Sequence, residues 1–320
     1  MSIMTVKGPV EKKEIGHCQP HEHLFIKEAK AKEINNALWL DNYEATLKEL
    51  LTYKKSGGTS IVDAQPIGSG RMTENLVKAS EESKINIIAS TGFHKLMYYD
   101  DNHWIHNVSV DELKDILKNE LVNGMYINTE YNYPKNQIEA KAGIIKTAYS
   151  ENSYEDIKRY KELLKAASLT SLETKTPIMC HTDKGKGALK VVNYLMELGV
   201  KPKAIIICHM DRKADNYEYH YRVANKGVYL DYDTIGRFKY HTDEKEIKLI
   251  KKLLEHGCED RILISLDTTR ERMKSYGGNI GLDYINNKFI PLLKEKGIRN
   301  EIINMMTRDN PARVLNKEYE

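Results

Sequence analysis

The sequence contains few cysteines and no long apolar runs. Its four cysteines, Cys18, Cys180, Cys208 and Cys258, are far apart and form no CxxC pair. This spacing excludes a disulfide scaffold and favours free thiols in a reducing compartment. No apolar run approaches the length that a bilayer requires, and the first residues, MSIMTVKGPVEKKEIG, lack the apolar segment of a secretory signal. We therefore expect a cytoplasmic protein that does not associate with membranes.

Charge of one sign does not dominate the sequence either. The 320 residues include 49 Lys and Arg and 46 Asp and Glu, which gives a net charge of +3. Proteins that bind nucleic acids usually carry a clear excess of basic residues, so we expect no nucleic-acid partner. Hydrophobic residues make up 41% and charged residues 30%, a composition typical of a globular chain rather than a disordered one.

Short apolar, β-rich runs alternate with helical patterns along the chain. The runs cover residues 17–25, 60–64, 85–90, 142–148, 177–181, 204–209, 228–231 and 261–266. The helical patterns cover residues 43–55, 73–82, 111–121, 154–174, 187–197 and 244–256. Continuous apolar strands between helices indicate a parallel sheet covered by helices. Eight units without a glycine-rich nucleotide loop after the first strand favour a (β/α)8 barrel over a doubly wound sheet.

The chain shows no linker that would divide it, so we expect one barrel domain over residues 1–320. Its tail, residues 278–320, is predicted to form two or three helices. Asn310-Pro311 should start the last helix, because proline is favoured at the first helical position.

Residues that can bind metals lie at the ends of predicted strands. In barrel enzymes this end carries the catalytic groups. Six such residues stand out: His21, His23, Lys146, His181, His209 and Asp267. His21 and His23 are two apart on an extended segment, so both side chains face the same side and can bind one metal ion. His181 and His209 lie on adjacent strands and can share a second ion, while Asp267, on the eighth strand, returns beside the first. Imidazole and carboxylate ligands suit Zn²⁺, with Mn²⁺ or Co²⁺ as alternatives.

Lys146 is unusual in this set because a buried lysine on a strand loses its hydration unless it is paired. A neutral amine can react with CO₂ to form a carbamate, which is a carboxylate that could bridge two cations. The alternative is an ordinary lysine in a salt bridge.

The remaining histidines lack a strand-end position. We expect His17, His94, His103, His106, His220, His241 and His256 to be ordinary core or surface residues. Cys180 and Cys208 precede predicted ligands, so strand alternation should turn both side chains away from the site, toward the helices.

The ordered set of motifs resembles the phosphotriesterase family of the amidohydrolase superfamily. The motifs are His-Glu-His-Leu-Phe (21–25), Ser-Thr-Gly-Phe-His (90–94), Ala-Gly-Ile-Ile-Lys (142–146), Cys-His-Thr (180–182), Cys-His-Met-Asp (208–211), Leu-Asp-Thr (266–268) and Asp-Asn-Pro-Ala-Arg-Val-Leu (309–315). Each motif is weak alone, but together they cover almost the whole chain.

The resemblance implies a (β/α)8 barrel with two divalent metals. Carried onto this sequence, it gives His21, His23 and Asp267 to one metal and His181 and His209 to the other. Carboxylated Lys146 and a hydroxide would bridge the two metals. It further implies hydrolysis of an ester-like bond, in which the hydroxide attacks and Asp267 passes its proton to the leaving alkoxide. A homodimer is the usual state of such proteins.

The loops after the seventh and eighth predicted strands are polar and basic. In barrels these loops often hold a phosphate, and arginine offers a two-pronged donor to it. We expect Arg270 and Arg272 to contact a substrate phosphate, assisted by Lys239 and by Tyr98 or Tyr99. The sequence therefore predicts a lactonase that opens a phosphorylated sugar 1,4-lactone.

Other activities remain open for the same metal site. They include hydrolysis of phosphotriesters, phosphodiesters, amides or acyl-homoserine lactones. A barrel that binds metal without turnover is a further alternative, against which Asp267 and Lys146 argue.

Overall fold

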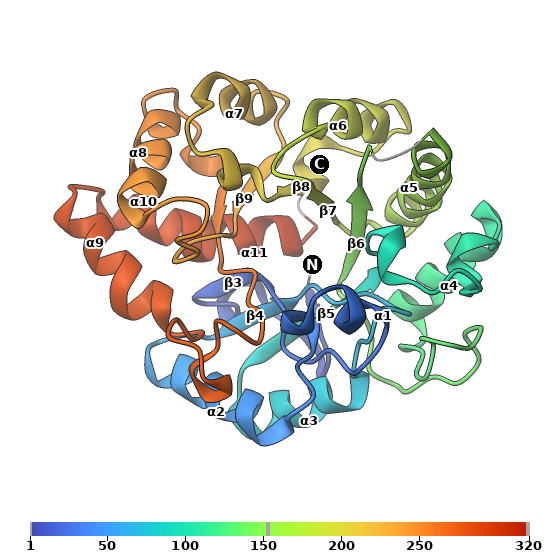
Figure 1. Ribbon diagram of the computed structural model, residues 1–320. Coiled ribbons are helices and arrows are strands. Elements are labelled where there is room, and N and C mark those ends of the chain that lie inside the picture. Colours follow the sequence, from blue (N-terminus) through green and yellow to red (C-terminus); the bar gives the residue numbers. More distant parts are fainter. Residues whose placement is uncertain (1, 152–153, 318–320) are drawn as a thin grey trace.

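Helices surround a ring of parallel strands in the computed structural model, which describes residues 2–151 and 154–317 (Figure 1). The strands of the ring are β3 (Cys18–Glu22), β4 (Ser60–Asp63), β5 (Asn86–Gly92), β6 (Ile144–Tyr149), β7 (Ile178–Thr182), β8 (Ile205–Cys208), β9 (Tyr229–Tyr232) and β10 (Ile262–Ile264). The helices are α1 (Lys30–Ile34), α2 (Tyr43–Lys55), α3 (Thr73–Ser83), α4 (Val110–Val122), α5 (Tyr154–Thr174), α6 (Ala188–Glu197), α7 (Tyr217–Ala224), α8 (Asp243–Leu254), α9 (Ile290–Glu295), α10 (Asn300–Asn304) and α11 (Asn310–Leu315).

The eight strands pair in chain order from β3 to β10, and every pair is parallel. The seam between β10 and β3 is closed largely by one buried side chain. Glu22 accepts hydrogen bonds from the backbone of Leu266 at 2.8 Å and of Thr268 at 3.0 Å, and Asp267 donates its N–H to the carbonyl of His21 at 3.1 Å. The predicted (β/α)8 barrel is confirmed, and its closure brings residue 267 next to residue 21.

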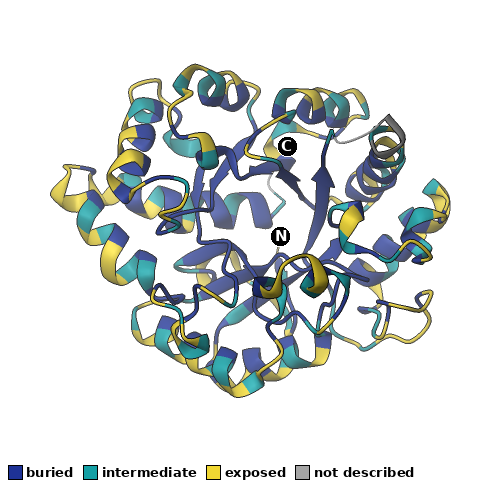
Figure 2. Cartoon of the chain, in the orientation of Figure 1, coloured by how far each residue is buried: buried dark blue, intermediate teal, exposed yellow. Residues whose placement is uncertain are grey.

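Strand alternation divides the core into two layers, and Figure 2 shows that the strands are buried while the outer helix faces are exposed. Residues such as Ile61 and Ile145 pack outward against the helices. Their neighbours Val62 and Ile144 point inward with Met179 and fill the barrel interior. The inner cluster also contains Ile3 and three residues of α11, which close the end of the barrel where the strands begin. The polar site therefore lies at the opposite, carboxyl end.

The eight predicted strands all form, and several helix ends differ from prediction by only one or two residues. The elements that were not predicted include the antiparallel hairpin of β1 (Ile3–Thr5) with β2 (Gly8–Val10) and the short helices α1 and α7. Within the described part of the chain, no helix combines the length and apolarity needed to span a bilayer.

The tail forms helices as predicted, and α11 starts at Asn310 with Pro311 as its second residue. Helix α10 continues through a π-helical turn, Met305–Asp309, directly into α11. A second π-helical turn, Ile285–Phe289, precedes Pro291 in α9 in the same way. Proline has no N–H to donate, and a wider turn before it avoids the clash that proline causes in a regular helix. Asn310-Pro311 therefore starts α11 as predicted, and the π-helical turn joins α11 to α10 without a break.

Candidate active site

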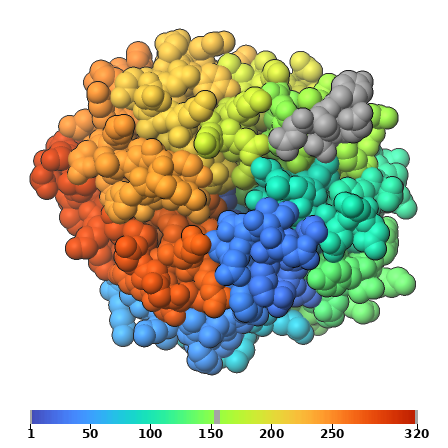
Figure 3. Space-filling model, viewed as in Figure 1, coloured from blue at the N-terminus to red at the C-terminus, as the bar shows by residue number. Residues whose placement is uncertain are grey.

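All six predicted metal ligands meet at the carboxyl end of the barrel. They are His21, His23, Lys146, His181, His209 and Asp267, and none of them is more than 8% exposed. His21, Lys146 and His181 lie on β3, β6 and β7. His23 and His209 directly follow β3 and β8, and Asp267 lies in the loop after β10. Loops that follow the strands crowd around the middle of the face shown in Figure 3, above this group.

The first predicted set is compact. Asp267 Oδ1 lies 3.4 Å from His23 Nε2 and 3.7 Å from His21 Nε2. Asp267 follows the strand in the left-handed backbone region, with φ of 48°, and His209 has φ of 65°. Such angles are uncommon outside glycine and cluster at functional sites. Two of the six predicted ligands are therefore held in strained conformations that turn their side chains inward.

His181 and His209, the second predicted pair, each turn one ring nitrogen toward the other. His181 Nδ1 and His209 Nε2 are 2.7 Å apart. Burial lowers the pKa of His181 to about 4 and the pKa of His209 well below its usual value, so both rings are neutral. His209 donates its Nδ1 proton to Asp233 at 2.6 Å, which leaves Nε2 as an acceptor. His181 Nε2 faces Asp183 at 3.5 Å, which leaves its Nδ1 as an acceptor too. A cation satisfies both lone pairs, so these residues fit a metal ion.

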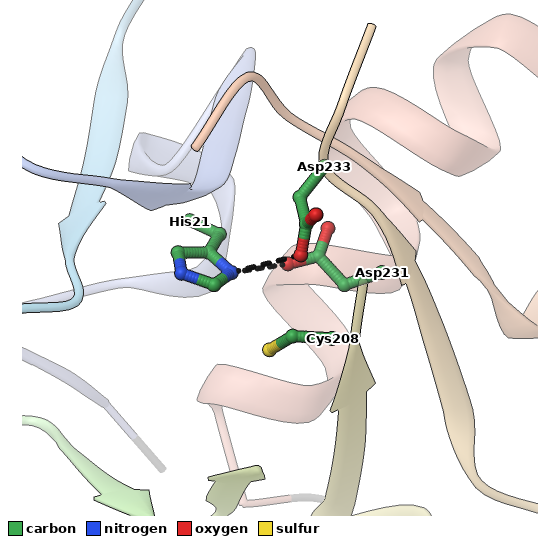
Figure 4. A group of neighbouring side chains, drawn as sticks. All are labelled: His21, Cys208, Asp231 and Asp233. Atoms are coloured by element: carbon green, nitrogen blue, oxygen red, sulfur yellow. Dashed lines mark ion pairs between the residues drawn. The ribbon is translucent and has the colours of Figure 1, made fainter. Parts of the chain in front are cut away.

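Two carboxylates that the sequence analysis missed orient the ligands from behind. His21 Nδ1 lies 3.2 Å from Asp231 and 3.1 Å from Asp233. Figure 4 marks both contacts with dashed lines. Ligating histidines commonly donate their second nitrogen to a carboxylate, which fixes the ring. The His209 and His21 imidazoles outweigh the effect of burial and hold the pKa of Asp233 below its usual range. The available signal was the spacing of two at the end of β9, a strand to which no ligand had been given.

Cys208 also faces this group, beside His21 (Figure 4). The prediction that strand alternation turns its side chain outward is wrong, because β8 ends at Cys208 and the left-handed His209 breaks the alternation. Cys180, in contrast, packs in the outer layer as expected. All four cysteines are buried and free.

Lys146 is completely buried without a carboxylate partner. Its Nζ lies 3.0 Å from His21 Nε2 and 3.7 Å from Met179 Sδ. None of the ion pairs found between described residues involves Lys146, so the salt-bridge alternative has no support here. A buried, unpaired ammonium is strongly disfavoured. A carbamate on Lys146 would remove the charge that these surroundings leave without a partner.

Gly92, at the end of β5, lets the two strands come close together where the backbone of Lys146 in β6 lies beside it. It has φ of +107°, and an added Cβ would overlap the carbonyl oxygen of Lys146. We expect Gly92→Ala to lower the free energy of unfolding by about 2 kcal/mol or more, through backbone strain and the clash together. Gly57→Ala is the matched control, because φ is +102° there and no atom lies within 4 Å of the added Cβ. Urea unfolding of both variants checks this, and equal losses would show that the approach to Lys146 is unimportant.

Two arginines that the sequence analysis did not assign contact Asp267. Arg212, after β8, and Arg237, after β9, each donate to Asp267 Oδ2 at 2.6 Å. Both guanidinium groups also lie against the face of Tyr240, at 5.2 and 6.0 Å. Burial alone would raise the pKa of Asp267, but Arg237, His23 and other neighbours hold it well below its usual value. The site mouth is therefore cationic on one side.

The residues predicted to bind phosphate occupy different environments. Arg270 lies over Trp39 at 4.6 Å and donates to the Trp39 carbonyl at 3.2 Å. Arg272 is buried and donates to the backbone carbonyls of Leu266 and Ile235. Its guanidinium thus joins the loops after β9 and β10, and a contact with phosphate stays a prediction. Lys239 is exposed near Tyr240.

The two neighbouring tyrosines after β5 point in different directions. Tyr98 packs the edge of its ring on His94 at 4.8 Å, beside the site. Tyr99 is buried, and its hydroxyl accepts the His94 N–H at 2.8 Å. His94 was expected to be an ordinary core or surface residue. It is buried, and its ring lies beside the site, 5.3 Å from His181 and 6.4 Å from His23. The loop after β5 carries it there although it stands two residues beyond the strand.

Comparisons of sequence and structure with known proteins indicate a family for this chain. The model of the phosphotriesterase family matches residues 1–315. The phospho-furanose lactonase of Mycoplasmopsis synoviae is 34% identical over 97% of this chain and 90% of its own length. A lactonase structure from Listeria monocytogenes superimposes with a TM-score of 0.87 at 29% identity, covering 98% of this chain and 99% of that one. The phosphotriesterase homology protein of Escherichia coli, complexed with phosphate in its active site, gives a TM-score of 0.84 at 27% identity over 94% and 99% of the two chains.

Proposed function

Because the chain belongs to the phosphotriesterase family, we propose that it is a metal-dependent lactonase that opens phosphorylated sugar 1,4-lactones. The observation that carries the substrate class is the pair Arg212 and Arg237 beside Asp267 at the site mouth. A small, buried, cationic mouth suits an anionic substrate, whereas a neutral triester or an acyl chain needs apolar walls. The names of two relatives, a phospho-furanose lactonase and a lactonase, agree with this choice.

Two divalent cations, Zn²⁺ in our proposal, would be held by the six predicted ligands. His21, His23 and Asp267 would hold one and His181 and His209 the other, with Lys146 between them as a carbamate. The facing lone pairs of His181 and His209 and the unpaired Lys146 are what this assignment explains. Such ions make water nucleophilic near neutral pH and polarise a carbonyl oxygen.

The chain's own groups supply the remaining chemistry. Asp267 is ionised near neutral pH because its pKa is held low, so its carboxylate can accept the proton of the attacking water. It can then return that proton to the ring oxygen that leaves as the lactone opens. Asp231 and Asp233 keep the His21 and His209 rings oriented throughout. Arg212 and Arg237 bind the substrate phosphate and orient the lactone, with Arg270, Lys239 and Tyr98 around them.

We expect Arg237→Met to raise KM about 10- to 100-fold for phosphorylated lactones, because it removes a charge-assisted donor worth about 1.5–3 kcal/mol. The KM of the unphosphorylated lactones should change little, whereas any effect on kcat through Asp267 should be shared by both substrates. Steady-state kinetics on matched pairs of lactones separates the two effects. The same assay on Arg270→Met tests the loop after β10. An equal rise in KM for phosphorylated and unphosphorylated lactones would show that Arg237 does not bind the substrate phosphate.

A further inference from the structure

A second buried cluster of metal-binding groups lies outside the site described above. It contains Asp211, in the 3₁₀ turn Met210–Lys213 after β8. The other two members are His241, just before α8, and Glu246, in the first turn of that helix. One ligand atom of each residue lies within 4.8 Å of the others. Asp211 and Glu246 are fully buried and His241 is 7% exposed. The three residues come from two segments that only the fold brings together.

The oxygens of this cluster lack partners. Asp211 Oδ2 accepts hydrogen bonds from the backbone N–H and the hydroxyl of Thr234, both at 2.7 Å. Its Oδ1 and both oxygens of Glu246 are buried without a hydrogen-bond partner among the described residues. No Lys or Arg of the described chain forms an ion pair with either carboxylate. Buried carboxylates of this kind are normally paired or bound to a metal ion.

The Nε2 atom of the His241 imidazole faces the oxygens of the same cluster. Its Nδ1 lies 3.2 Å from the Thr242 carbonyl, which can only accept, and the tautomer that donates there leaves Nε2 able to bind a cation. Its Nε2 faces Glu246 Oε2 at 3.1 Å and the Thr234 hydroxyl at 3.4 Å. The Thr234 hydroxyl already donates its hydrogen to Asp211, so it offers none to Nε2. Oxygen and nitrogen lone pairs therefore converge on one point.

We propose that Asp211, His241 and Glu246 bind a third divalent cation, separate from the two at the mouth of the barrel. One imidazole and two carboxylates form a donor set that suits Zn²⁺ or Mn²⁺. Two positive charges would balance two buried negative ones. Burial raises the pKa of Glu246 well above its usual value without the ion, which is the cost that the ion would offset.

The ion would act on the position of the loop that carries Arg212. Asp211 directly precedes Arg212, and Thr234 directly follows Asp233, which holds the His209 ring. An ion on Asp211 would thus join the turn after β8, the end of β9 and the start of α8. Its expected role is structural, because no oxygen or nitrogen of the cluster belongs to the predicted ligands of the catalytic ions.

Metal analysis of the full-length protein, loaded with Zn²⁺ and passed through a desalting column, tests the proposal. The expected content is three ions per chain for the natural protein and two for Glu246→Gln, which keeps the size of the side chain and removes its charge. Glu244→Gln, an exposed glutamate in the same turn of α8, is the matched control and should retain three. Two ions in all three proteins would overturn the proposal and leave a protonated His241 as the partner of Glu246.

An anomalous difference map of the zinc-loaded natural protein gives an answer that needs no variant. A peak between Asp211, His241 and Glu246, in addition to those at the catalytic ligands, is the expected result. Peaks at the catalytic ligands alone would contradict the third site while leaving the proposed function intact. A peak in the cluster alone would support the third site and contradict the catalytic metal assignment.

Discussion

Asp267→Asn is expected to lower kcat for lactone opening by about 100- to 10,000-fold, the range that a positioned acid–base group contributes. The amide keeps the shape of the side chain but cannot accept a proton from the attacking water. Arg212 and Arg237, which contact Asp267 at 2.6 Å, would also lose their charged partner. A pH-indicator assay of the metal-loaded variant measures the loss.

The interpretation of this variant depends on two accompanying measurements. Metal content and thermal midpoint should remain close to those of the natural protein, because four histidines and Lys146 still surround the ions. A kcat within about tenfold of the natural value, with metals retained, would remove Asp267 from the proton path. Loss of metal together with activity would show that Asp267 binds metal, and the loss of activity would then be no evidence for proton transfer by Asp267.

Lys146→Arg is expected to lower activity by more than about 100-fold, since even groups behind metal ligands cost 10- to 100-fold. Arginine keeps the positive charge and most of the length of the side chain, but a guanidinium does not form the carbamate. Lys146 is fully buried next to His21, so the charge that arginine keeps would also repel the ions. Metal content should therefore fall with activity.

The carbamate itself has a direct readout. Native mass spectrometry of the natural protein, equilibrated with bicarbonate, should show one added CO₂ that disappears in Lys146→Arg and at acidic pH. Isotope-labelled bicarbonate should give one carbonyl signal by NMR. An active, fully metal-loaded natural protein without this adduct would contradict the bridging role of Lys146.

The barrel, and the meeting of the six candidate ligands at one end of it, could be predicted because they follow from short-range rules. Continuous apolar strands, each followed by a helix, leave few architectures, and parallel strands bring their carboxyl ends together. His21 and His23 share a side through the period of two, and Asp267 meets them because the barrel closes. The assignment to the phosphotriesterase family is confirmed by the family model, which matches residues 1–315.

The residues behind and around the ligands could not be predicted in the same way. Cys208 faces inward in step with Ile206, and the left-handed conformation of His209, which no sequence period reveals, turns the next side chain inward as well. Arg212 and Arg237 come from different loops and meet at Asp267 and Tyr240, and His94 reaches the site on a loop. Asp231 and Asp233 did carry the period-two signal, but their role depends on the tautomers of His21 and His209.

The most direct test of the central claim is hydrolysis by zinc- or manganese-loaded protein of 1,4-lactones with and without a terminal phosphate, followed with a pH indicator. An acyl-homoserine lactone and an aryl phosphotriester complete the panel. The account predicts efficient turnover of the phosphorylated lactones and weak turnover of their unphosphorylated counterparts. Preferred turnover of the triester or the acyl lactone would contradict the assignment of the arginine-lined mouth, although the metal centre would remain.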